Sequence, residues 1–381
     1  MIDINGLSIL IVDDMESMRK SIRSMLKLLK IGKRVRLASN GQEGWNTIND
    51  TMIDLAIIDW NMPVMNGLEL LVKIRESKEY RNLPVIMITA EAVKEFVAEA
   101  AESDIDGYLL KPLTPEDLEE KIKNVIHSAN NPTKATMYIQ KGRELEEEGQ
   151  LEEAIEMVKL AIAERNNVSR YFRILGQLYL KKENDDIAEK CLIKAVAIND
   201  NDALTRYMLS DFYIKKNKLI NAIKYYDEAV NISPRKIGVG VELGEILISQ
   251  GMKTEAMAIF QKVVGYSKKK LVDCERIAEL CIKDGDYAYA KQLLKSIVDD
   301  NPDRIDLRIK LAILHEKTGN IEKAIIDLNE INSETNDLNA KLLLSRIYIR
   351  MKKPFVADRF LNEILKIDPT HEVAIELRRQ V

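Results

Sequence analysis

The sequence predicts an α/β domain built on a five-stranded parallel sheet, followed by an all-α array of helical repeats. Up to about residue 128, short and nearly continuous apolar runs alternate with amphipathic stretches. Such runs suit parallel strands that are buried on both faces. Beyond residue 133 these runs stop, and alanines recur at intervals of 34 residues. With 381 residues, the chain is long enough for two or three domains.

Composition narrows the class of partner. The net charge is −4, and neither half of the chain is strongly basic, so we expect no nucleic-acid partner. No apolar run is long enough to span a membrane, and the N-terminus lacks a leader pattern, so we expect a cytoplasmic protein without membrane insertion. Cys191, Cys274 and Cys281 have no metal-ligand spacing, and we expect buried free thiols.

Five apolar runs in the first part are the expected strands. They are Ser8–Val12, Arg34–Ala38, Asp54–Ile58, Pro84–Ile88 and Tyr108–Leu110. Amphipathic stretches between them, such as Glu16–Lys30 and Ala92–Glu102, are expected helices. The last helix has Thr114 as its N-cap and Pro115 in its first turn. Five such units predict a doubly wound sheet that binds ligands at the carboxyl ends of its strands.

Charged and polar residues gather at those strand ends. Asp13 and Asp14 end the first run, Asp59 ends the third, Thr89 ends the fourth, and Lys111 follows the fifth. Three converging carboxylates repel one another unless a cation neutralises them, and hard oxygen ligands suit Mg²⁺. This pattern favours phosphoryl transfer, with Asp59 as the nucleophile that becomes an aspartyl phosphate. Lys111 would supply fixed positive charge, and the Thr89 hydroxyl would donate a hydrogen bond to a phosphoryl oxygen.

The strings LIVDD, IIDWNMP, MITAEA and GYLLKP resemble the receiver domain of two-component response regulators, and closely the chemotaxis regulators of the CheY type. The resemblance covers residues 5–128 and implies the flavodoxin-like fold. It implies Asp14 and Asp59 as direct ligands of Mg²⁺, with Asp13 acting alongside, often through water. The backbone carbonyl of Asn61 would be the third protein ligand.

The resemblance also implies a cis bond between Lys111 and Pro112. Thr89 and Tyr108 would be the switch pair, with Thr89 moving toward the phosphate and Tyr108 rotating inward. Asn61 and Glu91 match positions that control access of the hydrolytic water, so we expect a short-lived phosphate. The alternative for Glu91 is a helix N-terminal acid favoured by the helix dipole.

The source of the phosphate is expected to be a separate protein or molecule. None of the three histidines, His127, His315 and His371, has the setting of a phosphotransfer histidine. We therefore expect a sensor histidine kinase or a small phosphodonor. The receiver would catalyse only its own phosphotransfer and autodephosphorylation, so the chain is not expected to be an enzyme in any other sense.

The second part repeats every 34 residues, with one interval of 33. The repeated alanines are Ala154, Ala188, Ala222, Ala256, Ala290, Ala324 and Ala357. Twelve residues before each lies a small residue, where the two helices of a repeat are expected to cross. These are Gly142, Gly176, Ser210, Gly244, Ala278, Ala312 and Ser345. The pattern resembles the tetratricopeptide repeat (TPR).

The resemblance implies a TPR superhelix of seven repeats over residues 135–371. We expect the receiver at 1–129, a short linker at 130–134 and a capping helix at 372–381. The repeats' groove, lined by their first helices, would bind an unidentified protein. One line of groove positions is apolar and predicts either a docking stripe or ordinary packing of the groove floor. It consists of Leu180, Ile214, Ile248 and Ile282.

We therefore expect a phosphorylation-switched adaptor whose repeats bind a partner protein. The alternative is that the repeats mediate phosphorylation-controlled self-association, for example as a homodimer. A DNA- or RNA-directed output would need a basic surface that the near-neutral second part does not offer. An enzymatic output domain is not expected, because the repeats extend to residue 371.

Overall fold

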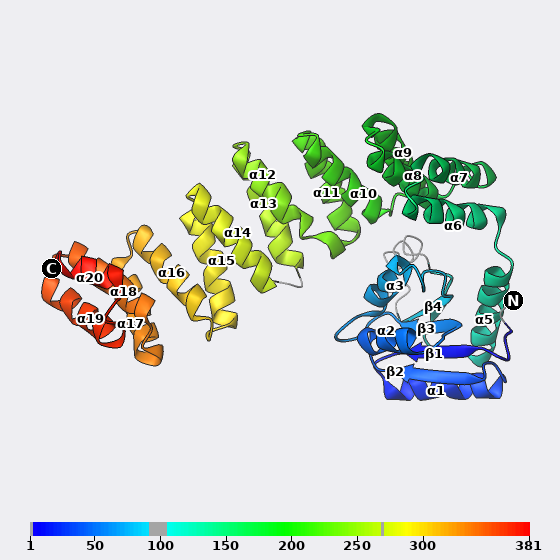
Figure 1. Cartoon of the computed structure of the whole chain (residues 1–381), viewed down its shortest axis with the longest axis horizontal. Coiled ribbons are helices and arrows are strands. Elements are labelled where there is room, and N and C mark those ends of the chain that lie inside the picture. Colours follow the sequence, from blue (N-terminus) through cyan, green and yellow to red (C-terminus); the bar gives the residue numbers. More distant parts are fainter. Residues whose placement is uncertain (1–2, 91–104, 268–269) are drawn as a thin grey trace. The chain divides into compact units, whose positions relative to one another are not determined.

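The computed structural model describes residues 3–90, 105–267 and 270–381. Contacts between Cα atoms divide the chain into two compact units, Met1–Ser233 and Pro234–Val381. The first unit contains an α/β domain and three helix pairs, and the second contains the remaining helices (Figure 1).

Five parallel strands form one sheet in the order β2-β1-β3-β4-β5, as the sequence predicts. Their bounds are β1 Ser8–Val12, β2 Arg34–Ala38, β3 Leu55–Asp59, β4 Val85–Thr89 and β5 Gly107–Leu110. Strands β3 and β4 begin one residue later than expected, and β5 begins one residue earlier. The Asp54 carboxylate accepts a hydrogen bond from the Ser8 backbone N–H at 2.8 Å, and Pro84 has no N–H to donate. Both strands also end one residue later than the predicted runs, so Asp59 and Thr89 are their last residues.

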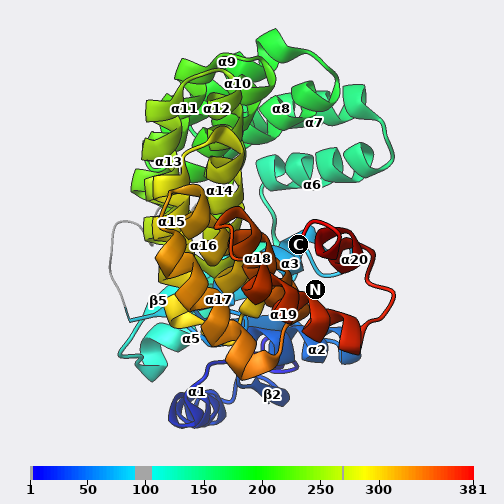
Figure 2. The same cartoon turned by 90° about the vertical axis from the view of Figure 1, so that its left-hand side faces the viewer.

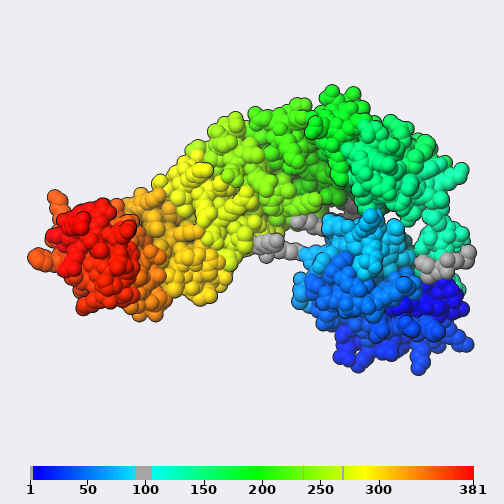
Figure 3. Space-filling view, viewed as in Figure 1, coloured from blue at the N-terminus to red at the C-terminus, as the bar shows by residue number. Residues whose placement is uncertain are grey.

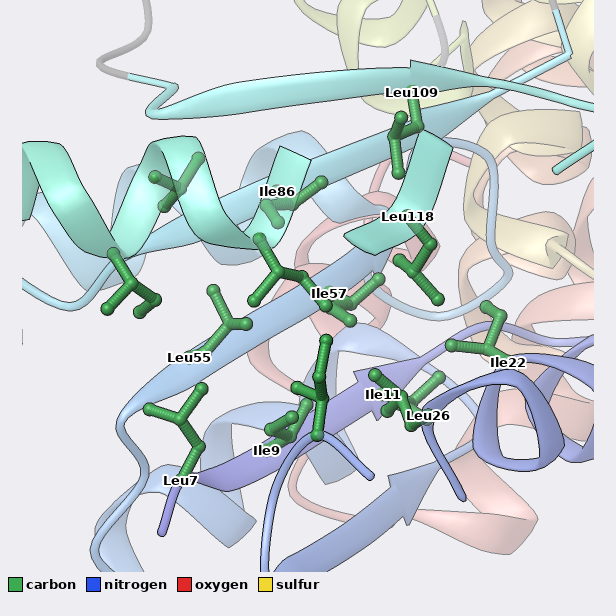
Figure 4. Packing of buried hydrophobic residues seen from close by; sticks show 14 of the residues in the cluster. Leu7, Ile9, Ile11, Ile22, Leu26, Leu55, Ile57, Ile86, Leu109 and Leu118 are labelled. Atoms are coloured by element: carbon green, nitrogen blue, oxygen red, sulfur yellow. The ribbon is translucent and has the colours of Figure 1, made fainter. Parts of the chain in front are cut away.

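Helices cover both faces of the sheet. One face packs against α1 (Glu16–Leu28) and α5 (Pro115–Asn130). Figure 4 shows Ile9 and Ile11 of β1 pointing into this layer with Leu118 of α5. The alternate residues of β1 point into the other layer, against α2 (Gly41–Asp50) and α3 (Gly67–Glu76). The predicted helix over Ala92–Glu102 lies outside the described residues.

The start of α5 matches its predicted signal. The Thr114 side chain accepts a hydrogen bond from the Asp117 backbone N–H at 3.1 Å, and Pro115 occupies the first turn. Three residues separate α5 from the next helix, which begins at Lys134. The Thr133 side chain caps that helix by accepting a hydrogen bond from the Thr136 N–H. A short connection therefore joins the α/β domain to the repeats.

Antiparallel helix pairs make up the rest of the chain, and Figure 2 gives a second view of them. The pairs are α6 Lys134–Glu147 with α7 Leu151–Glu164, α8 Ser169–Lys181 with α9 Asp185–Ile198, α10 Ala203–Lys215 with α11 Leu219–Ile232, α12 Val239–Ser249 with α13 Lys253–Tyr266, α14 Lys270–Asp284 with α15 Tyr287–Asp300, α16 Ile305–Lys317 with α17 Ile321–Thr335, and α18 Leu338–Arg350 with α19 Pro354–Ile367. Helix α20 spans Glu372–Arg378, and the 3₁₀ turn η1 spans Pro234–Lys236. In the second unit, successive helices pack in chain order, which the colours of Figure 3 follow from α14 to α20.

The small residues lie where the sequence places them. All seven repeated alanines are fully buried. A Cβ added to Gly176 would lie 2.9 Å from the Leu192 side chain, so the two helices of that pair cross closely at the glycine. In the next pair, the Ser210 hydroxyl donates to the Ala222 carbonyl at 3.0 Å. These contacts confirm the predicted reason for the 34-residue spacing.

A second periodic feature was not predicted. In each repeat the turn between the two helices contains a residue with a φ of +53° to +88°, again at the repeat spacing. These residues are Gly149, Glu183, Asn217, Gly251, Gly285, Gly319 and Lys352. Glycine adopts this left-handed conformation at low cost, which explains four of the seven identities. Glu183 and Lys352 adopt it despite a side chain.

All three cysteines are buried and free, as predicted. Within the described ranges, no helix combines the length and the apolar character that crossing a membrane requires.

Candidate functional site

The residues predicted at the strand ends share one edge of the sheet. Asp13 follows β1, Asp59 ends β3 and Thr89 ends β4, and these three residues are buried. Lys111 follows β5, and its peptide bond to Pro112 is cis, as expected. Parallel topology alone brings these positions together, because the carboxyl ends of all five strands point the same way.

Lys111 is the centre of the charged cluster. Its Nζ lies 2.6 Å from Asp59 Oδ1 and 3.1 Å from Asp13 Oδ2. The Lys111 side chain is only 17% exposed, so both contacts are shielded from bulk water. An ammonium held between two buried carboxylates provides fixed positive charge where further negative charge could be accommodated.

Burial is the main influence on ionisation in this cluster. It raises the pKa of Asp59, and the neighbouring Asp13 and Asp14 carboxylates raise it further, while Lys111 opposes the shift. Burial also disfavours the charged form of Lys111, but its hydrogen bonds to Asp59 and Asp13 outweigh this effect and raise the Lys111 pKa. A buried carboxylate is therefore kept in a site that only partly neutralises it.

The third carboxylate, Asp14, lies close enough for its charge to raise the pKa of Asp59, but it is less buried than Asp13 and Asp59. Asp14 is exposed, and Asn61 is exposed as well. Among the described residues, no three His, Cys, Asp or Glu side chains are arranged as a ready metal centre. The donor set nevertheless suits a hard cation, since two buried carboxylates and one nearby exposed carboxylate share only the single charge of Lys111.

Arg19 of α1 supports the loop that carries the first two aspartates, and sequence reasoning missed it. Its guanidinium donates to the backbone carbonyls of Asp13 at 2.5 Å and Asp14 at 3.0 Å. The Met15 N–H donates to Asp13 Oδ1 at 2.8 Å. The sequence does show an arginine in the first turn of the helix that follows the two aspartates. It does not show that this arginine binds backbone carbonyls, because every residue has one.

Gly67 holds α3 against the candidate nucleophile. A Cβ at this position would collide with the Asp59 backbone carbonyl oxygen. The Gly67 N–H donates to the Trp60 carbonyl at 3.0 Å. Asn66 and Glu69 form a reciprocal capping box at the start of the helix. Helix α3 thus begins in direct contact with the backbone of the Asp59 loop.

The predicted switch residues occupy different environments. Thr89 is buried, whereas Tyr108 is 42% exposed with Lys121 Nζ 5.6 Å from its ring centroid. The tyrosine therefore has its outward orientation in this structure. Glu91, predicted to modulate hydrolysis, lies outside the described residues.

The four apolar groove positions are half-buried. In the first unit, Leu180 packs against the core of the first two helix pairs, and Ile214 lies on α10. In the second unit, Ile248 and Ile282 lie on α12 and α14. Each of these side chains is therefore partly packed and partly accessible to solvent, and none of them is fully exposed.

Comparisons with known proteins match families to both parts of the fold. The response regulator receiver domain family matches residues 9–123. Two tetratricopeptide repeat families match parts of the region after it, one over 135–167, 171–202, 203–236 and 241–270, and the other over 282–337.

Curated relatives match the receiver. A chemotaxis protein CheY homolog of Campylobacter jejuni is 39% identical over 121 residues, which are 32% of this chain and 92% of that protein. Chemotaxis protein CheY of Pseudomonas aeruginosa is 36% identical over 124 residues, 32% of this chain and 99% of that protein. The chain belongs to the response regulator receiver family, and it carries tetratricopeptide repeats after its receiver domain.

Solved structures give matches of the same kind. Chemotaxis response regulator CheY4 of Vibrio cholerae is 32% identical, with a TM-score of 0.30, over 32% of this chain and 98% of that chain. A tetratricopeptide repeat protein of Parabacteroides merdae is 17% identical, with a TM-score of 0.37, over 65% of this chain and 98% of that chain.

Proposed function

We propose that this chain is a phosphorylation-controlled adaptor. Its receiver accepts a phosphoryl group on Asp59, and its repeats bind a partner protein in a manner that depends on that phosphate. The observation that carries the proposal is the contact of Lys111 with both Asp59 and Asp13 at one edge of the sheet. Phosphoryl transfer depends on such positioning and charge neutralisation.

In the proposed reaction, an Asp59 carboxylate oxygen attacks the phosphorus of a phosphohistidine on a sensor kinase, or of a small phosphodonor. The new O–P bond forms as the donor's bond to phosphorus breaks, and the donor keeps that electron pair. Lys111 remains beside the charged product, and the Thr89 hydroxyl donates to a phosphoryl oxygen. When bound by Asp13, Asp14, Asp59 and the Asn61 carbonyl, Mg²⁺ would supply neutralising charge.

The output we propose is protein binding by the repeats, with no enzymatic activity beyond the receiver's own phosphotransfer and autodephosphorylation. Support comes from the match of most of residues 135–337 to repeat families. Tetratricopeptide arrays present extended concave surfaces to partners. Thr89 and Tyr108 would report the phosphate to this output, because Thr89 ends β4 beside Asp59 and Tyr108 is 42% exposed on the neighbouring strand β5.

Phosphorylation is tested by intact mass spectrometry after incubation with acetyl phosphate and Mg²⁺. We expect a gain of one phosphoryl group in wild type and none in Asp59→Asn. Asp54→Asn is the matched control, because Asp54 precedes the same strand at its opposite end and an asparagine can still accept from Ser8. Equal phosphorylation of wild type and Asp59→Asn would contradict the assignment.

We further propose that Asn61 and Glu91 keep the phosphate short-lived. Their spacing of two residues after Asp59 and Thr89 supports this part of the proposal. The decay of the phosphorylated mass after removal of donor should be complete within minutes. A half-life of hours would contradict it.

Partner binding is tested by pull-down from the native cell extract with wild type and Asp59→Asn, each with and without beryllofluoride as the phosphoryl mimic. A partner captured by wild type in only one state, and equally in both conditions by Asp59→Asn, supports the adaptor. Size-exclusion chromatography of the same samples identifies the alternative, state-dependent self-association. Identical results in every state would contradict a phosphorylation-dependent output.

A further inference from the structure

The receiver and the first repeat meet through a charged contact within the unit Met1–Ser233. Arg81, in the turn between α3 and β4, donates both terminal nitrogens to the carboxylate of Glu147, the last residue of α6. The Nη2–Oε2 distance is 2.9 Å. The Arg81 side chain is 12% exposed and the Glu147 side chain is 36% exposed, so only the arginine side of this bidentate pair is shielded from water. Lys78 adds a weaker contact, with Nζ 3.8 Å from Glu147 Oε2.

Arg75 fixes the position of Arg81. The Arg75 guanidinium, near the end of α3, donates to the backbone carbonyls of Arg81 at 2.9 Å and Leu83 at 2.8 Å. It also pairs with the Asp106 carboxylate at 2.8 Å. Asp106 accepts from the Val85 N–H at the start of β4. The turn that presents Arg81 is therefore tied to both α3 and the sheet.

The receiver faces the first helices of two successive repeats. Arg143 of α6 lies near enough to Arg81, and Arg170 of α8 near enough to Arg75, for their charges to interact. Burial, followed by the charge of Arg173 and then of Arg75, lowers the pKa of Arg170 to about 9. First helices line the inner groove of such repeats, so the receiver lies beside two of the helices that we propose for partner binding.

This contact has the properties of one that can open. A cavity of about 340 Å³ lies between the α3–β4 turn and α6, and every residue that lines it is polar. Polar contacts between domains bury little apolar surface, so movement of the two parts is the default expectation. The Arg81–Glu147 pair is a specific contact between this turn and α6.

Helix α3 links this contact to the phosphoacceptor. Gly67 at its start lies against the Asp59 carbonyl, and Arg75 near its end holds the turn that carries Arg81. Leu70, Leu71 and Ile74 between them are fully buried, so the ten-residue helix is held as a rigid body by the core. A change in the Asp59 loop can therefore be carried to Arg81 by a small movement of one element.

We propose that the Arg81–Glu147 pair is a latch, a contact that holds the receiver beside the groove side of the first two repeats. Helix α3 couples this latch to the state of Asp59. Closed, the latch makes the receiver an internal competitor for the groove. Open, it exposes the first helices α6 and α8 to a partner. The latch itself stands on the contact alone, whereas its trigger rests on the proposed phosphorylation.

The test is small-angle X-ray scattering of the full chain in a charge-swap cycle. Arg81→Glu and Glu147→Arg should each increase the radius of gyration, and the double variant should restore the wild-type value. Added salt should increase it in wild type and in the double variant. Lys123→Glu on α5 and Glu156→Arg on α7 are matched controls, because each reverses one charge of an exposed pair within a single helix. Far-UV circular dichroism verifies that every variant is folded.

Single swaps that scatter like wild type, or a double swap that stays expanded, would overturn the latch. The trigger is tested in the same experiment with Mg²⁺ and beryllofluoride, which should expand wild type but not Asp59→Asn. If the mimic changes tryptophan fluorescence without expanding the chain, the coupling through α3 is wrong while phosphorylation of Asp59 stands. If the mimic does not bind, the proposed function itself fails, and a successful swap cycle still establishes the latch.

Discussion

At the scale of single residues, Asp59 combines two demands that oppose each other. A nucleophilic carboxylate must be ionised, yet burial and two neighbouring carboxylates raise its pKa. The folded protein therefore loses stability when Asp59 ionises. Because the shift is upward, this cost is absent at pH values below the pKa of the unfolded chain. It grows as the pH rises and is complete above the pKa of the folded state.

Asp59→Asn should therefore raise the melting temperature of the receiver at pH 7 in the presence of EDTA, by several degrees. The gain should shrink as the pH falls to 4 and below. Mg²⁺ should stabilise wild type more than the variant, because the variant lacks one carboxylate ligand. Thermal unfolding followed by tryptophan fluorescence measures all three effects. A variant less stable than wild type at pH 7 without metal would contradict the electrostatic account.

Gly244 illustrates packing at the same scale. A Cβ at this position would collide with the ring of Phe260, which is fully buried. Gly244→Ala should therefore destabilise the second unit by about 1–3 kcal/mol.

The matched control for Gly244→Ala is Gly265→Ala in α13, where an added Cβ meets no atom within 4 Å. It should instead be neutral or stabilise by up to about 0.5 kcal/mol, because alanine is favoured over glycine in a helix but Gly265 lies in the last turn of α13. Urea denaturation followed by circular dichroism compares the two. Equal effects of the two substitutions would contradict the packing argument.

At the scale of elements, some turns within the repeats have a residue whose side chain disfavours the backbone conformation that the turn requires. Glu183 adopts a φ of +58° between α8 and α9, where most repeats have glycine. Glu183→Gly should stabilise the chain by up to about 1 kcal/mol, because the left-handed strain of a side-chain residue outweighs the entropy cost of glycine.

The neighbouring Lys182 provides the control, because its φ of −84° is ordinary for any residue. Lys182→Gly should destabilise slightly, since it adds flexibility to the unfolded chain and removes the exposed ion pair of Lys182 with Glu152. The denaturant midpoints of both variants, compared with that of wild type, measure these changes in stability. The explanation is wrong if both substitutions shift stability in the same direction.

Elements also mark the limits of sequence reasoning. The strands were predictable because apolar runs end in polar residues, and three of their starts, predicted at Asp54, Pro84 and Tyr108, were wrong by one residue. Asp13, Asp59 and Lys111 were found because parallel topology brings strand ends together. Arg19, Arg75 and Arg81 were not, because their partners are backbone carbonyls or residues distant in sequence. Arg81 and Glu147, for example, are 66 residues apart with no shared pattern.

At the scale of the whole molecule, two compact units predict at least two unfolding events. Calorimetry should resolve more than one transition. Mg²⁺ should raise the temperature only of the transition that contains the receiver, because the proposed ligands all lie there. A single transition that shifts as one with Mg²⁺ would show instead that the units unfold cooperatively.

The uneven distribution of aromatic residues gives each part of the chain its own optical signal. Both tryptophans, Trp45 and Trp60, lie in the receiver, whereas eleven of the thirteen tyrosines lie in the repeats. Trp60 directly follows Asp59, and Trp45 contacts Tyr80 edge-on with ring centroids 6.0 Å apart. Excitation at the red edge of the absorption band therefore reports the receiver without labels. Energy transfer from tyrosines of the repeats to these two tryptophans depends on the distance between the repeats and the receiver, so it measures that distance in the unlabelled chain.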